Sequence, residues 1–96
     1  MVSDFEVVEA IEDVMDCNGY CPGDEIVSDL VEAIACFVMY GESGRFSAYL
    51  ESRDVDGTPA IGIVMQLEEY ANRRRLPDPS DIIRQAVRAA EAIWED

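Results

Sequence analysis

The sequence predicts an all-α fold, a compact bundle of four to five short helices forming a single acidic domain over residues 1–96. Two observations lead to this prediction. Apolar side chains recur at the 3.6-residue period of an amphipathic helix in several segments. Short turns that contain glycine or proline separate these segments, as is typical between antiparallel helices. Hydrophobic residues make up 49% of the chain, which is enough to build one core.

The first half of the chain predicts two helices. Apolar residues follow the helical period over 4–15, and Ser3 or Asp4 can cap the start of that helix. A turn is expected over 18–23, where glycine and proline interrupt the pattern. A second helix should run from near residue 24 to residue 40 or 41. Its second half is apolar on all sides, which is typical of a central helix with several neighbours.

Two structures compete for the segment that follows. Thr58 and Pro59 match a helix N-cap followed by proline at the first helical position, so one prediction is a helix from about residue 59 to residue 74. Apolar alternation favours a small β-hairpin near 46–66 instead, in which 46–51 pairs with 60–65. The sequence leaves both alternatives open.

The last helix has the strongest signals. Asp78 matches an N-cap, Pro79 stands at the first helical position, and Asp81 lies in the first turn, where a carboxylate suits the helix dipole. Apolar residues then trace one face as far as Trp94. This pattern predicts an amphipathic helix that packs on the core.

The charge of the chain excludes several classes of function. The chain has 21 acidic residues and seven basic ones, all arginine, for a net charge of −14. Direct binding to nucleic acid or to an anionic membrane needs a positive surface, so neither is expected. No apolar run approaches the ~20 residues of a membrane span, and the N-terminus lacks the features of a secretory signal. A cytoplasmic protein is the resulting expectation.

The residue types present also argue against catalysis and cofactor binding. Histidine is absent, which removes the commonest general base and metal ligand. Cys17, Cys21 and Cys36 do not have the spacing of a zinc site, and their odd number argues against a disulfide framework. We therefore expect no enzyme activity, no cofactor and no metal.

The turn after the first predicted helix resembles part of an EF-hand calcium loop. If Glu25 takes the last of the twelve loop positions, Asp16, Asn18 and Gly19 fall at the third, fifth and sixth. Val14 stands where the family has its first aspartate. The resemblance implies a degenerate EF-hand-like helix–loop–helix protein as one alternative.

The segment 68–87 is similar to the helix–turn–helix part of ribbon–helix–helix repressors. Members of that family read DNA with a short basic strand directly before the first helix. In this chain the corresponding segment, 54–59, is acidic and rich in turn residues, so the element that reads DNA is missing. Arg73, Arg74 and Arg75 can instead complement the negative end of a helix dipole or pair with acids of the N-terminal half.

The acidic residues are concentrated in the first half of the chain. Residues 1–44 contain eleven acids and no basic residue, while 45–96 contain ten acids and seven arginines. Seven of the N-terminal acids form two lines at helical spacing, one about 15 Å long on the first predicted helix and a shorter one on the second. The first line is Glu6, Glu9, Asp13 and Asp16, and the second is Glu25, Asp29 and Glu32.

Two explanations fit these lines. In the first, the acidic face binds a basic site on a nucleic-acid-binding protein as a nucleic-acid mimic, as inhibitors from phages and mobile elements do against restriction or CRISPR enzymes. In the second, the acidity adapts the surface to the high salt of a halophile. The chain would then be a small structural or assembly domain that forms a homodimer.

Overall fold

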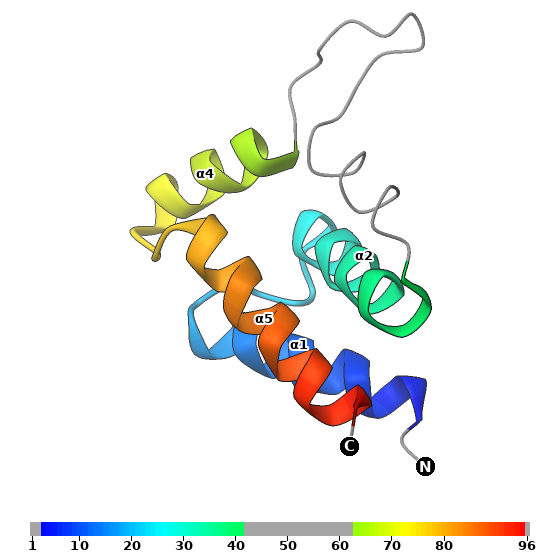
Figure 1. Ribbon diagram of the computed structural model, residues 1–96. Coiled ribbons are helices and arrows are strands. Elements are labelled where there is room, and N and C mark those ends of the chain that lie inside the picture. The colour runs from blue at the N-terminus through cyan, green and yellow to red at the C-terminus, as the bar shows by residue number, and fades with distance from the viewer. Residues whose placement is uncertain (1–2, 42–62, 96) are drawn as a thin grey trace, which may run out of the picture.

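Four α-helices lie in the part of the chain that the computed structural model describes, residues 3–41 and 63–95. They are α1 (Asp4–Cys17), α2 (Glu25–Tyr40), α4 (Ile63–Arg74) and α5 (Pro79–Trp94) (Figure 1). The all-α class is therefore confirmed for these ranges.

The helices pack around α5, the last element in the chain. α1 and α5 make the most extensive contact, α2 packs against both, and α4 touches α5 and, less closely, α2. As a result, the N-terminal end of α1, the C-terminal end of α2 and the C-terminal end of α5 lie at the same end of the bundle (Figure 1).

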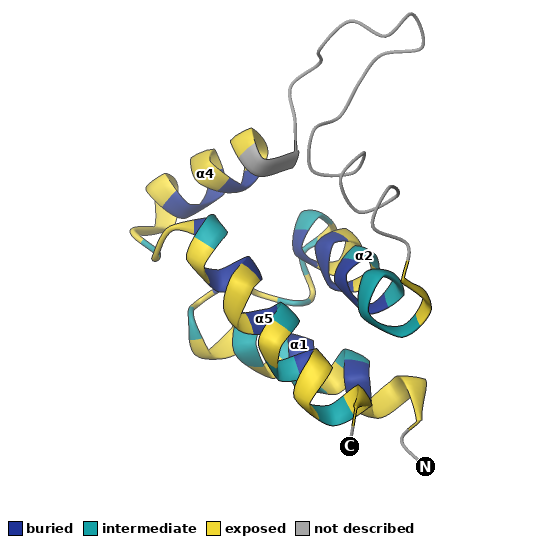
Figure 2. Cartoon of the chain, in the orientation of Figure 1, coloured by how far each residue is buried: buried dark blue, intermediate teal, exposed yellow. Residues whose placement is uncertain are grey.

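The core is apolar, and it contains no buried polar or charged side chain from the described ranges. On α1, Val7, Ile11 and Met15 are fully buried at four-residue intervals, so one face of the helix points inward. Ala86 and Ala90 line the buried face of α5, where their small side chains leave room for close packing. Figure 2 shows that each of the four helices has both buried and exposed residues along its length. Each large apolar side chain buried in this way contributes about 1.5–3 kcal/mol.

A Schellman motif ends α1. The Tyr20 amide donates to the Met15 carbonyl at 2.8 Å, and the Gly19 amide donates to the Asp16 carbonyl at 3.0 Å. Gly19 has a φ of +86°, the left-handed conformation that this motif requires and that glycine adopts without a steric penalty. The predicted turn over 18–23 begins with this motif.

The same motif ends α4, with a different residue at its left-handed position. The Leu76 amide donates to the Ala71 carbonyl at 2.9 Å, and Arg75 has a φ of +56°. The chain then enters α5 as predicted, because the Asp78 carboxylate accepts the Ser80 amide at 2.9 Å and Pro79 occupies the first turn.

The hairpin alternative is wrong for the residues that the structure describes. Residues 63–65 belong to the first turn of α4 rather than to a strand. The helix is favoured because Leu67, Tyr70 and Ala71, at helical spacing, bury one face of α4 on the core. The other predicted strand, 46–51, and the predicted helix start at residue 59 lie outside the described residues.

Within the described ranges, none of the helices has the length and apolar character needed to cross a bilayer.

Candidate partner-binding surface

All seven acidic residues of the two predicted lines are exposed on the helices where the sequence placed them. Glu6, Glu9, Asp13 and Asp16 lie on α1. Glu25, Asp29 and Glu32 lie on α2. In the described part of the chain, none of these seven carboxylates makes a hydrogen bond or an ion pair. Their charge therefore faces solvent without a neutralising partner on the described chain.

The described arginines lie elsewhere. The Arg74 guanidinium is 3.8 Å from the carboxylate of Asp24 and 3.9 Å from the centre of the Tyr70 ring. Arg84 pairs with Asp81, its neighbour one turn away, at 3.6 Å. An arginine of the C-terminal half therefore does pair with an acid of the N-terminal half. That acid is in the turn before α2 and belongs to neither line.

The α1 line borders a groove between α1 and α5. Glu6, Glu9 and Asp13 form its acidic wall, and Ala10 and Ile93 supply its apolar surface. The groove has a volume of about 340 Å³, at the lower end of the ~300–1,000 Å³ range of ligand pockets. The carboxylates in this groove therefore stand beside apolar surface.

The α2 line borders a different groove. Glu25 and Asp29 lie there beside Ile26 and across from Gln66 of α4, in a volume of about 310 Å³. The structure thus brings three acids to one groove and two to another. Asp16 and Glu32 are exposed and line neither.

Exposed aromatic side chains lie at the end of the bundle where α1 begins and where α2 and α5 end. Phe5 is 71% exposed, Tyr40 60% and Trp94 36%. The Tyr40 hydroxyl donates to the Asp4 carboxylate at 3.2 Å, which ties the end of α2 to the start of α1. The sequence placed Trp94 on the apolar face of the last helix, but it did not predict a site at Phe5 or Tyr40. The spacing of Phe5, four residues before Glu9, was the available signal, since it puts both on one side of the helix.

A pair of tyrosines fixes the turn between α1 and α2 against the end of α4. The rings of Tyr20 and Tyr70 stack with their centres 5.7 Å apart. The Tyr70 hydroxyl donates to the Asp24 carboxylate at 2.5 Å and accepts the Cys21 amide at 3.3 Å. The Tyr20 hydroxyl donates to the Pro77 carbonyl at 2.6 Å. These contacts hold the residue that precedes α2, and so help to orient the acidic line on that helix.

The surroundings of both tyrosines favour the neutral phenol. Burial, with smaller contributions from Asp78 and Tyr70, raises the pKa of Tyr20 to about 12. Burial and the hydrogen bond to Asp24 raise the pKa of Tyr70. Both hydroxyls therefore remain hydrogen-bond donors at neutral pH.

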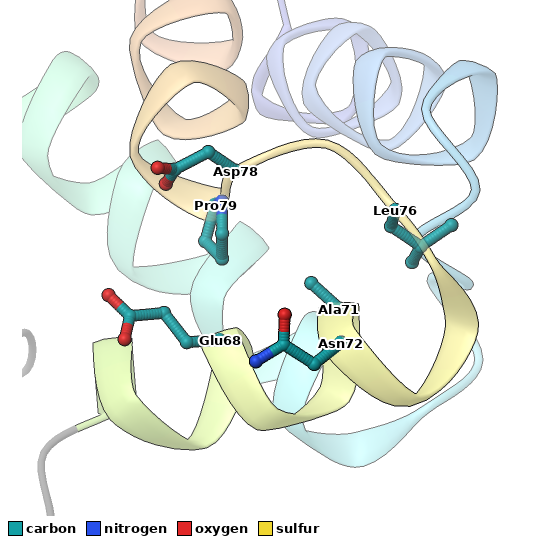
Figure 3. A pocket seen from close by; sticks show the side chains of 6 residues that line it. All are labelled: Glu68, Ala71, Asn72, Leu76, Asp78 and Pro79. Carbon is teal, nitrogen blue, oxygen red and sulfur yellow. The ribbon is translucent and has the colours of Figure 1, made fainter.

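A further pocket lies between α4 and α5, with a volume of about 440 Å³ (Figure 3). It contains none of the seven predicted residues. Two carboxylates and one amide supply its polar groups, and one of these carboxylates, that of Asp78, already caps α5. Its lining residues are Glu68, Ala71, Asn72, Leu76, Asp78 and Pro79.

The turn that resembles an EF-hand loop is held by other contacts. The Asn18 side chain donates to the Val14 carbonyl at 2.7 Å, and Gly19 completes the Schellman motif of α1. In the described ranges, no cluster of three or more His, Cys, Asp or Glu residues could hold a metal ion.

The α4–α5 pair forms the helix–turn–helix predicted from 68–87, while 54–59 lies outside the described residues. Comparison of the chain with protein-family models, with curated proteins and with solved structures finds no match.

Proposed function

We propose that this chain is a non-enzymatic interaction protein whose acidic α1–α2 surface occupies a basic site on a nucleic-acid-binding protein. One observation carries the proposal: the seven carboxylates of the two lines are exposed, and none is neutralised by a described residue. Like charges at these spacings destabilise a helix by about 0.2–0.5 kcal/mol per pair. A basic partner would remove that repulsion on binding.

The spacing of the α1 carboxylates supports mimicry of a nucleic-acid backbone. From Glu6 to Asp16 the line rises about 15 Å along the helix axis. One strand of duplex DNA carries four to five phosphates over about 15 Å of its axis. Four carboxylates over the same length give a similar linear charge density. A basic groove that holds DNA would therefore also attract this helix.

In size and charge the chain fits the inhibitors that phages and other mobile elements direct against restriction or CRISPR enzymes. A homodimer is the alternative, with the apolar second half of α2 and the face of α5 that carries Trp94 as its interface. Pairing two copies there would bring together two chains of net charge −14, so electrostatic repulsion opposes it. Light scattering after size exclusion distinguishes the two states.

The test is a charge reversal with a matched control. Glu6, Glu9, Asp13 and Asp16 are changed together to lysine. The control changes four exposed acids to lysine, two on α4, one on α5 and one at the C-cap of α5, which alters the net charge equally. The control residues are Glu68, Glu69, Glu91 and Glu95. The readout is retention of nucleic-acid-binding proteins from a lysate, with duplex DNA as the competitor.

We expect the unmodified chain to retain basic proteins that DNA then releases. The α1 variant should lose them, while the control keeps most of the binding. Circular dichroism checks that both variants are folded. If a folded α1 variant retains the same proteins as the unmodified chain, α1 is not the mimicking surface.

A further inference from the structure

We propose that α4 is a latched element that opens independently of the other three described helices, with the side chain of Tyr70 as its latch. Among the described helices, α1, α2 and α5 each contact the other two, whereas α4 contacts only α5 and α2 (Figure 1). Release of α4 would therefore leave the contacts among α1, α2 and α5 in place. This device would exist whether or not the chain binds a basic partner.

Apolar packing holds α4 at only a few points. Over residues 65–74, only Leu67, Tyr70 and Ala71 are buried, and Met65 is 60% exposed. A groove borders each of the two contacts that α4 makes, one of about 440 Å³ between α4 and α5 and one of about 310 Å³ between α4 and α2. Sparse apolar burial is a property of segments that open locally, before the whole domain unfolds.

Polar contacts add to this packing, and they converge on Tyr70. Its hydroxyl donates to the Asp24 carboxylate at 2.5 Å and accepts the Cys21 amide at 3.3 Å. Its ring stacks on that of Tyr20, and the centre of the ring lies 3.9 Å from the Arg74 guanidinium. Tyr70 therefore joins α4 to the turn between α1 and α2. Removal of its hydroxyl takes away two of these contacts and leaves the ring in place.

A released α4 would not remain a helix. It has 12 residues, and an isolated helix of that length is marginal in water because its first turn is costly to form. The backbone amides of α4 would therefore exchange their hydrogens with solvent whenever the latch is open. Amide hydrogen exchange consequently measures the opening directly.

Opening of the latch also affects the start of α2. Asp24 is the N-cap of α2, and its carbonyl accepts the Ser28 amide at 2.9 Å. Its carboxylate makes no capping hydrogen bond to α2, and instead contacts Tyr70 and Arg74 of α4. Loss of these contacts frees the residue from which α2 begins. We therefore expect the first turn of α2 to loosen together with α4.

The experiment is native-state hydrogen exchange, followed for each amide by NMR under conditions where the rate reports the opening equilibrium. Low concentrations of urea separate local opening from global unfolding, because the urea dependence scales with the surface exposed. Tyr70→Phe removes the hydroxyl of the latch. Ile11→Val is the matched control, since it removes one carbon from a fully buried side chain of α1, which does not contact α4. Circular dichroism checks that both variants are folded.

We expect the amides of α4 to exchange faster than those of α1 and α5, with a smaller dependence on urea. Tyr70→Phe should accelerate the α4 amides and the Ser28 amide by about ten-fold, and also those of α1 and α5, because the latch is lost in global unfolding too. Ile11→Val should accelerate the α1 and α5 amides by about three-fold to ten-fold. It should leave the α4 amides unchanged, because the core around Ile11 stays intact when α4 opens.

Equal acceleration of the α4, α1 and α5 amides by Ile11→Val would overturn the proposal, because α4 would then open only when the whole domain unfolds. If Tyr70→Phe leaves the α4 amides unchanged, Tyr70 is not the latch. A Ser28 amide that does not follow the α4 amides would exclude the coupling to α2. The charge reversal of α1 tests the proposed function separately, since it retains Tyr70 and Asp24.

Discussion

Individual polar contacts join parts of this chain that are far apart in sequence. Tyr20 and Pro77 are 57 positions apart, and the hydroxyl of the first donates to the carbonyl of the second. Tyr70 contacts Cys21 and Asp24 from across the bundle. Because Tyr20 and Tyr70 are almost completely buried, the loss of a phenolic proton would leave a charge next to the core.

Stability should therefore fall at high pH through the ionisation of Tyr20. Its pKa is about 12 in the folded chain, against about 10 in an unfolded one. A raised pKa means that the neutral phenol stabilises the fold below pH ~10, and that this contribution disappears as the pH rises towards 12. A difference of about two units corresponds to about 2–3 kcal/mol. Urea unfolding at a series of pH values measures the loss.

Tyr20→Phe supplies the control. It lacks the titrating group and the hydrogen bond to Pro77, so its stability at neutral pH should be lower by about 0.5–1.5 kcal/mol. Its stability should change less between pH 10 and 12, where only other groups titrate. An unchanged alkaline loss in this variant would show that Tyr20 is not the cause.

At the scale of the helices, the ends of α1 and α4 require a residue in the left-handed conformation. α1 and α4 both end in a Schellman motif, with Gly19 at the left-handed position of the first and Arg75 at that of the second. The left-handed conformation costs an L-amino acid roughly 1–2 kcal/mol, and glycine avoids that cost. A side chain at Gly19 would also overlap Leu76 of the other motif.

Opposite substitutions at these two positions should have opposite effects. Gly19→Ala should destabilise the chain by at least about 1–2 kcal/mol, because it adds backbone strain and displaces Leu76. Arg75→Gly should stabilise it by up to about 1 kcal/mol, because it relieves the same strain at an exposed position. Thermal unfolding followed by circular dichroism compares both with the unmodified chain.

Arg75→Asn is a useful third variant, because asparagine tolerates the left-handed region better than arginine and retains a side chain. It should fall between arginine and glycine in stability. A destabilising Arg75→Gly would mean that the Arg75 side chain contributes more than its backbone strain costs.

At the scale of the whole molecule, unbalanced charge is the dominant property. A net charge of −14 on 96 residues opposes the compact state through mutual repulsion. Sixteen apolar side chains are buried in the described ranges, and this core acts against that repulsion. The acidity could serve a basic partner or adapt the chain to high salt. The two explanations differ in how much salt the fold needs to screen the repulsion between its carboxylates.

Thermal unfolding in potassium chloride between about 0.1 and about 3 M separates these explanations, since the screening length falls from ~10 Å to below ~3 Å over this range. We expect a folded chain at the lowest salt, with a gradual rise in melting temperature as repulsion is screened. This result would agree with the basic-partner proposal. Folding only near molar salt would indicate that the surface is adapted to its solvent.

The sequence by itself determined the helices and their exposed acidic lines. Capping residues, the 3.6-residue period and glycine at a turn are local signals. The helix start at Asp78 and Pro79 and the turn at Gly19 could therefore be predicted without knowledge of the fold. The same period separates the buried face of α1 from its acidic face. In 46–66 the apolar residues fit two periods, and the hairpin alternative failed where α4 buries a helical face on the core.

Only the tertiary structure decided what lies beside each line. The groove beside Glu9 on α1 is completed by Ile93 of α5. Arg74 pairs with Asp24 because the end of α4 lies next to the turn before α2. Both contacts join residues that are fifty or more positions apart. Local periodicity carries no information about which helices become neighbours, because their arrangement is set by the packing of all the buried faces at once.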